Sequence, residues 1–146
     1  MTVTFFGHRD CPDAIRARLI TVLENLIENE GADTFFVGNN GAFDAMVYNA
    51  LKKLRARYSH IRFNVVLSYM PREYRREDAE YYRDTLLPEE IAEAVPRFAI
   101  DKRNLWLLKK SDTVVTYVVR SFGGAAKFKA RAKRLGRTVI ELSETL

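Results

Sequence analysis

Short runs of β-branched and aromatic residues alternate along this chain with longer stretches in which apolar residues recur every three or four positions. The short runs predict strands, at residues 2–6, 34–37, 61–67, 114–119 and 139–142. The longer stretches predict helices, at residues 14–29, 43–54, 100–110 and 125–135. Strands that alternate with helices at this spacing predict an α/β fold, with a doubly wound, mainly parallel five-stranded sheet and helices on both faces.

The length of 146 residues, 47% of them hydrophobic, is enough for a domain with its own core, and we expect residues 1–146 to form a single domain. Residues 69–94 differ from the rest because they are rich in Tyr and Arg and only weakly periodic. A connection of this length, reaching residue 98, is typical of a functional loop or a lid over a binding site. The alternative interpretation of this segment is a poorly ordered surface loop.

Polar and glycine-rich turns follow three of the predicted strands. They are Gly7–Arg9, Gly38–Gly41 and Arg120–Gly124. In doubly wound sheets, ligands bind outside the carboxyl ends of the strands, where the strand order reverses. The third turn ends in two glycines that lead into a helix, whose first turn leaves backbone N–H groups unpaired. We therefore expect one shared pocket for an anion, and the alternative for the third turn is a tight turn with solvated lysines.

The net charge of +5 is a mild basic bias that suits nucleotides, phosphates or nucleic acid. No apolar run approaches the ~20 residues of a transmembrane helix, so no membrane partner is expected. A single cysteine, Cys11, excludes an internal disulfide, and with no secretory signal expected it indicates the cytoplasm. No cluster of His, Cys or paired carboxylates has metal-ligand spacing, so no metal is expected.

Four motifs, spread in order over nearly the whole chain, carry a resemblance to a known family. They are FFGHR at Phe5–Arg9, VGNNGAFDAM at Val37–Met46, FAIDKRNLWLL at Phe98–Leu108 and TYVVRSFGGAAK at Thr116–Lys127. Together they resemble the SLOG superfamily, related to LOG and DNA-processing proteins, and within it the YpsA/YoqJ-like branch of small bacterial proteins. The resemblance implies a Rossmann-like sheet and a pocket for a nucleotide or a nucleotide-derived ligand.

A more distant group in this resemblance, the LOG-type phosphoribohydrolases, releases a base from a nucleoside monophosphate. Its members carry a PGGxGTxxE motif and an upstream Arg-Lys pair. Arg103-Asn104 falls at that pair and Gly123-Gly124 at the double glycine, but Ala130 stands where the catalytic glutamate would be. Without that carboxylate, the glycosidic reaction lacks the group that would handle charge or a proton.

Several candidate residues have a functional and a structural interpretation. Arg9 and Arg103 are suited to bidentate contacts with a phosphate, with surface salt bridges as the alternative. Asp44 is a candidate for ribose or base contact and for catalysis, although a first helical turn favours a carboxylate anyway. His8 is a candidate general acid or base, or a structural residue that fixes the first loop. The residues expected to bind ligand are Gly7, His8, Arg9, Gly38, Asn39, Asn40, Gly41, Asp44, Arg103, Asn104, Arg120, Ser121, Gly123, Gly124 and Lys127.

Three functions are compatible with these features. The first is a cytoplasmic binding or sensor domain for a nucleotide or a nucleotide-derived small molecule whose identity is open. The second is a nucleotide-processing enzyme, and the third is a domain that binds single-stranded nucleic acid.

On the last predicted helix Lys127, Arg131 and Arg134 share one face. Such a pattern is typical of a solvated surface, and the alternative is a stripe that binds nucleic acid. Self-association into a homo-oligomer is left open.

Overall fold

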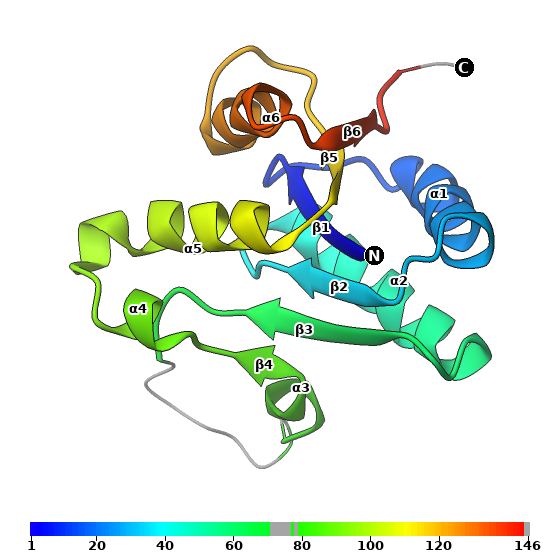
Figure 1. Ribbon diagram of the computed structural model, residues 1–146, viewed down its shortest axis with the longest axis horizontal. Helices are drawn as coiled ribbons and strands as arrows, with labels where there is room; N and C mark the ends of the chain where they lie inside the picture. The colour runs from blue at the N-terminus through cyan, green and yellow to red at the C-terminus, as the bar shows by residue number, and fades with distance from the viewer. Residues whose placement is uncertain (71–76, 78, 145–146) are drawn as a thin grey trace.

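A computed structural model of the chain describes residues 1–70, 77 and 79–144 (Figure 1). Its centre is a six-stranded sheet in the order β4-β3-β2-β1-β5-β6, and every neighbouring pair is parallel. The order reverses at β1, which lies between β2 and β5, so the sheet is doubly wound. The strands are β1 (Thr2–Gly7), β2 (Thr34–Val37), β3 (Arg62–Val66), β4 (Thr85–Leu86), β5 (Thr113–Tyr117) and β6 (Thr138–Glu141).

Helices cover both faces of this sheet. Phe5 and Phe6 are neighbours on β1, and because successive strand residues point to opposite faces, they belong to two different cores. Phe5 packs with residues of α1 and α2, and Phe6 packs with residues of α5 and α6. The α/β architecture with helices on both faces is therefore confirmed. The helices are α1 (Ile15–Asn29), α2 (Ala42–Arg57), α3 (Ala79–Arg83), α4 (Glu89–Ala92), α5 (Pro96–Lys110) and α6 (Gly124–Arg134).

The predicted number of five strands is wrong, because β4 adds a sixth at one edge of the sheet. β4 has two residues and lacks the apolar run that identifies a strand in sequence. Its position is held by tertiary contacts instead. Val65 N–H on β3 donates to the carbonyl of Asp84, and Arg55 on α2 binds the carboxylate of Asp84 through two hydrogen bonds, at 2.9 and 3.1 Å.

The predicted helix at residues 100–110 is longer at its start, because α5 begins at Pro96. Proline is well suited to a first helical turn, where its missing N–H has no partner to lose. The Tyr/Arg-rich connection contains α3, β4 and α4, and residues 71–76 and 78 of the predicted lid lie outside the described residues.

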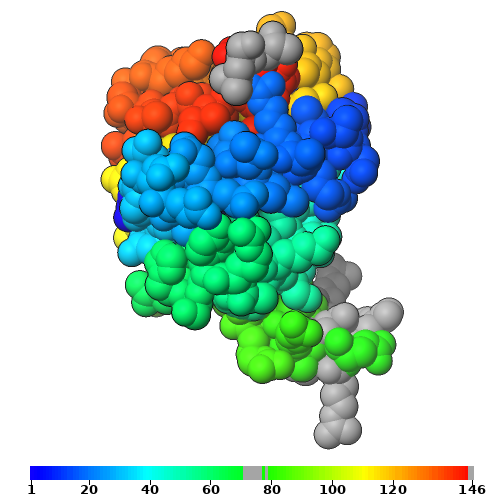
Figure 2. Space-filling model, turned by 90° about the vertical axis from the view of Figure 1, so that its right-hand side faces the viewer, coloured from blue at the N-terminus to red at the C-terminus, as the bar shows by residue number. Residues whose placement is uncertain are grey.

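At the end of the sheet where β2 and β3 begin, the molecular surface is closed (Figure 2). There α1, in blue, crosses the middle of the molecule between the α6–β6 region, in orange to red, and the green turn after α2. No helix in the described part of the chain is long and apolar enough to cross a bilayer.

Candidate functional site

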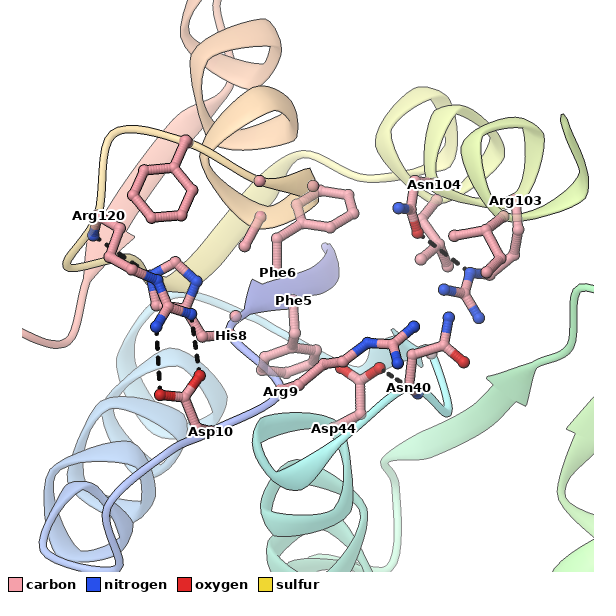
Figure 3. Close-up of a pocket in the computed structure, with 18 residues that line it drawn as sticks. Phe5, Phe6, His8, Arg9, Asp10, Asn40, Asp44, Arg103, Asn104 and Arg120 are labelled. Carbon is pink, nitrogen blue, oxygen red and sulfur yellow. Dashed lines mark hydrogen bonds and ion pairs between the residues drawn. The ribbon is translucent and has the colours of Figure 1, made fainter. Parts of the chain in front are cut away.

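A hollow of about 460 Å³ lies at the carboxyl ends of the central strands, where the strand order reverses (Figure 3). Its walls come from the turns after β1, β2 and β5, from α5 and from the start of α6. This is the position at which a doubly wound sheet offers a binding site. Phe6, Ile100 and Leu107 supply apolar parts of the wall, and the remainder is mostly polar or glycine.

Arg103 reaches the hollow from α5 and is almost completely buried, with 2% of its surface exposed. Its guanidinium donates hydrogen bonds to Asn39 Oδ1 at 3.0 Å, to the Val66 carbonyl at 3.4 Å and to Asn104 Oδ1 at 3.1 Å. These acceptors are neutral, and Arg103 forms no ion pair with any described residue. Burial lowers the pKa of Arg103, and the charge of Asp44 opposes that shift. Because a guanidinium stays protonated in proteins, the hollow contains a buried positive charge that forms no ion pair with the described residues.

Asp44, in the first turn of α2, is the buried acid of the site, with 9% of its surface exposed. Its Oδ2 accepts the backbone N–H of Asn40 at 2.8 Å. Burial raises the pKa of Asp44 to about 6, against the opposing effects of Asn40 N–H and Arg103. Gly38 permits this arrangement, because a Cβ there would come within 2.9 Å of Asp44 Oδ2 and 3.1 Å of Arg103 Cζ. Asp44 therefore changes charge near neutral pH inside the site.

Two further arginines line the hollow but differ in their partners. Arg9 is exposed, lies two residues after β1 and extends toward Asp44 (Figure 3), and no ion pair joins it to the described residues. Arg120 instead binds Asp10 through two hydrogen bonds, at 2.9 and 3.2 Å, and this contact lowers the pKa of Asp10. The charge of Arg9 is therefore available to a ligand, whereas that of Arg120 is already partly balanced.

His8 is buried and acts as a hydrogen-bond acceptor for the loop after β5. Its Nε2 lies 3.0 Å from the backbone nitrogen of Val119 and 3.4 Å from that of Arg120, which assigns the ring proton to Nδ1. Burial and the charge of Arg120 lower the pKa of His8, so the neutral form is favoured. This geometry matches the structural interpretation of His8. Because His8 accepts the N–H groups of Val119 and Arg120, these two amides are not free for a ligand.

Glu141, the last residue of β6, holds the same loop from the other side and was not among the expected site residues. Its carboxylate accepts hydrogen bonds from Thr116 Oγ1, Val118 N–H, Lys129 Nζ and both donors of Ser143. Burial alone would raise the pKa of Glu141, but these hydrogen bonds outweigh it and lower the pKa to about 2. The sequence does contain a signal for this role, because Glu141 is a lone acid in a short apolar strand. Burying an acid is unfavourable unless it has hydrogen-bond partners.

The start of α6 offers free backbone donors to the hollow. Gly123 is the residue before the helix, with φ of 94°, a conformation that other residues rarely adopt. No side chain caps the helix, and a Cβ on Gly123 or Gly124 would meet no atom within 4 Å. Because first-turn N–H groups have no acceptor within their own helix, they favour an anion in this part of the hollow.

The structure brings together most of the residues expected to bind ligand. Those that line the hollow are Gly7, His8, Arg9, Gly38, Asn40, Asp44, Arg103, Asn104, Arg120, Gly123 and Gly124. Gly7 also has a packing role, because a Cβ there would lie 2.2 Å from the Phe43 ring.

The other expected residues lie elsewhere. Asn39 and Gly41 line a smaller hollow of about 150 Å³, next to Tyr48 and Tyr81. Ser121 and Lys127 line neither hollow, and Lys127 forms an ion pair with Asp101 at 2.8 Å. Within the described residues, no group of three or more His, Cys, Asp or Glu side chains is arranged to hold a metal ion.

Comparison with known proteins gives matches only at the level of structure. No family model and no curated protein matches the sequence. The chain is similar to DNA processing protein A from Streptococcus pneumoniae, with a TM-score of 0.68 and 17% identity over 96% of this chain. It is also similar to DNA processing protein A from Helicobacter pylori, described for its single-stranded DNA binding mode, with a TM-score of 0.67 and 17% identity over 100% of this chain.

The chain spans 49% of the Streptococcus pneumoniae protein and 66% of the Helicobacter pylori protein. At this level of identity the likeness is one of fold. It is consistent with the resemblance to the SLOG superfamily noted in the sequence. The chain has the Rossmann-like fold that is also present in DNA processing protein A.

Proposed function

We propose that this chain binds single-stranded nucleic acid and holds one phosphate-bearing nucleotide of the strand in the hollow at the carboxyl ends of β1, β2 and β5. Membership of the SLOG superfamily, and of its YpsA/YoqJ-like branch, is part of this proposal. Arg9, Arg103 and the first turn of α6 bind the phosphate, and Asp44 lies beside them.

The observation that carries the proposal is the buried guanidinium of Arg103. Arg103 is 2% exposed, its acceptors among the described residues are neutral, and the charge of Asp44 acts on it without an ion pair, so a further anion close to the guanidinium is favourable. Arg9 adds a second cation without an ion pair to the described residues, and the amides of Gly124 and Ala125 add uncharged donors. Arginine and helix N-termini are the groups that proteins most often use to bind phosphate.

The fold comparison favours a nucleic acid over a free small molecule. Both similar structures are DNA processing proteins, and one of them is described for binding single-stranded DNA. The net charge of +5 suits a polyanion as well. A hollow of about 460 Å³ favours a single strand, because a nucleotide must leave the stack of a duplex to enter it.

Fluorescence anisotropy with a labelled oligo-dT of about 20 nucleotides tests the proposal. We expect binding that weakens as salt rises, and a loss of at least about tenfold in affinity for Arg103→Gln and for Arg9→Gln. Arg18→Gln, on α1 and away from the hollow, is the charge-matched control and should bind as the wild type does. Absence of binding by the wild type at low salt, or equal loss in the control, contradicts the proposal.

A second candidate, a free nucleotide or nucleotide-derived ligand, is favoured by one observation. The volume of about 460 Å³ lies in the range of small-molecule sites. The same Arg103→Gln variant would then lose affinity for a nucleoside monophosphate, and unlabelled monophosphate would displace the oligonucleotide. If monophosphates bind and oligonucleotides do not, this candidate replaces the first.

The enzymatic alternative is tested separately from binding. Asp44 and Asp10 are the carboxylates among the residues lining the hollow, and Ala130 lies outside it. Chromatography of nucleoside monophosphates after incubation with the protein is the direct measurement. A product that Asp44→Asn abolishes would assign catalysis to the site.

A further inference from the structure

Basic residues are concentrated on the two helices that cover one face of the sheet. α5 and α6 pack side by side on the core that contains Phe6 and Val114, and they contact each other. Asp101 is the only acidic residue within these two helices. Their basic residues are Arg97, Lys102, Arg103, Lys109, Lys110, Lys127, Lys129, Arg131, Lys133 and Arg134.

The helices on the opposite face show a different pattern. On α1 and α2 most of the basic side chains have a carboxylate partner. The pairs are Arg16 with Asp13, Arg57 with Glu24, Arg55 with Asp84 and Lys52 with Glu80. The positive charge of the described residues is therefore distributed asymmetrically, and most of its excess lies over α5 and α6.

Within α5 and α6, two cations are already balanced, since Lys127 binds Asp101 and Lys129 binds Glu141. The remaining exposed cations have no carboxylate partner in the described part of the chain. We define the basic face as Lys102, Lys109, Lys110, Lys133 and Arg134, all of them exposed. Lys109-Lys110 and Lys133-Arg134 are neighbouring like charges that repel one another, so an external anion is favourable there.

The basic face begins beside the hollow and extends along the two helices away from it. Lys102 lies between Ile100 and Asn104, which line the hollow, and the other four residues lie in the last turns of α5 and α6. Ile100 and Asn104 of α5 form one wall, and Gly123, Gly124 and Ala125 at the start of α6 form the next. A strand that leaves the hollow between these walls must follow the outer surfaces of the same two helices to reach the cations in their last turns. The apolar sides of both helices are used in the core, through Leu107, Leu108, Phe128 and Ala132, so they are not free to enter a lipid bilayer.

We infer that the basic face binds the sugar–phosphate backbone of the single strand whose nucleotide occupies the hollow. This inference rests on the proposed function and adds a second contact surface to it. The hollow holds one nucleotide, and the basic face holds the next few by charge alone. Such a contact is independent of base sequence and strongly dependent on salt.

The test compares a short and a long oligo-dT, of about 4 and about 20 nucleotides, by fluorescence anisotropy over a range of salt concentrations. The test variant replaces Lys109, Lys110, Lys133 and Arg134 by Gln. The control variant replaces Arg18, Lys53, Arg62 and Arg83 by Gln, which removes the same charge outside α5 and α6. Thermal unfolding verifies that both variants are folded. If the fourfold test variant does not fold, the double variant Lys109→Gln/Lys110→Gln takes its place.

We expect the test variant to bind the short oligonucleotide as the wild type does, and to bind the long one at least about tenfold more weakly. Its slope of log affinity against log salt should fall by about 2 to 3, at roughly 0.7 for each lost phosphate contact. The control variant should keep most of the wild-type slope.

Three outcomes would overturn the inference alone. If the test variant keeps full affinity for the long oligonucleotide while Arg103→Gln loses it, the hollow binds the strand and the basic face does not. If both fourfold variants lose affinity equally, only net charge matters. If the test variant loses binding to phosphatidylserine vesicles but not to the long oligonucleotide, the partner is a membrane surface. No binding of either oligonucleotide by the wild type overturns the proposed function together with this inference.

Discussion

Arg103 and Asp44 both lie against the Cα of Gly38, both buried and of opposite charge, without forming an ion pair. Each satisfies its hydrogen bonds with neutral groups instead: Arg103 with Asn39, Asn104 and a carbonyl, Asp44 with the N–H of Asn40. A buried pair that is kept apart leaves its positive member available to an external anion. It also leaves an acid whose charge acts against that anion.

The charge of Asp44 should therefore control affinity. Its pKa of about 6 lies above the ordinary 3.8, so the carboxylate is charged above pH 6 and neutral below it. A phosphodiester next to it is repelled only when Asp44 is charged, so affinity for oligo-dT should rise as the pH falls through about 6. Asp44→Asn should bind several-fold more tightly than the wild type at neutral pH and should lose this pH dependence. Anisotropy titrations from about pH 5 to about pH 8 measure both effects. Weaker binding by Asp44→Asn would instead show that the carboxylate accepts a hydrogen bond from the ligand.

Arg103 should matter more for binding than for stability. Replacing it by Met removes a buried charge that forms no ion pair with the described residues, and this gain offsets the loss of its neutral hydrogen bonds. We expect the free energy of unfolding in urea to change by no more than about 1 kcal/mol, while oligo-dT binding falls by at least about tenfold. Loss of several kcal/mol would mean that the hydrogen bonds to Asn39 and Asn104 hold the fold together.

His8 should make the loop after β5 sensitive to acid. Its pKa in the folded protein is below the ordinary 6.5, so the unfolded chain takes up a proton first and the contribution of His8 to stability is lost as the pH falls below about 6.5. Protonation of Nε2 removes the acceptor for the N–H groups of Val119 and Arg120. Amide hydrogen exchange, corrected for its intrinsic pH dependence, should show weaker protection of these two amides near pH 5 than near pH 7.5. His8→Ala should show the weak protection at both pH values.

Glu141 should be worth much more to stability than an exposed acid on the same face. The side chains of Glu141 and Lys129 are 4% and 15% exposed, so Glu141→Gln leaves a buried ammonium without its partner. We expect a loss of about 3 kcal/mol in the free energy of unfolding. The exposed pair of Asp101 and Lys127, at 55% and 52%, is the matched control, and Asp101→Asn should cost less than about 1 kcal/mol.

The carboxylate of Glu141 should also limit the stability of the protein in acid. The pKa of Glu141 is about 2 in the folded protein, below its ordinary 4.5, so its contribution is present above about pH 4.5 and is lost as the pH falls toward 2. Urea titrations at several pH values should therefore show stability of the wild type falling in this range, and a shallower fall for Glu141→Gln. Parallel pH profiles for the two proteins would contradict this role.

Much of the fold was accessible from the sequence, because its main elements carry strong local patterns. β1, β2, β3, β5 and β6 are apolar runs, and α1, α2 and α6 have apolar residues at helical spacing, so each could be recognised without knowing its neighbours. β4 could not, since its two residues are held by pairing with β3 and by the Arg55–Asp84 contact. The glycine turns were recognisable for the same local reason, and most of their residues line one hollow.

The sequence alone therefore determined the architecture and the edge of the sheet at which ligand-binding residues gather, because both depend on local periodicity and on the geometry of parallel strands. Only the tertiary structure decided what each polar residue does there. His8 and Glu141 bind loop amides contributed by Val118, Val119 and Arg120, Lys127 pairs with Asp101, and Arg103 is buried without an ion pair to the described residues. These roles depend on distances between residues far apart in the chain, and no local pattern encodes such distances.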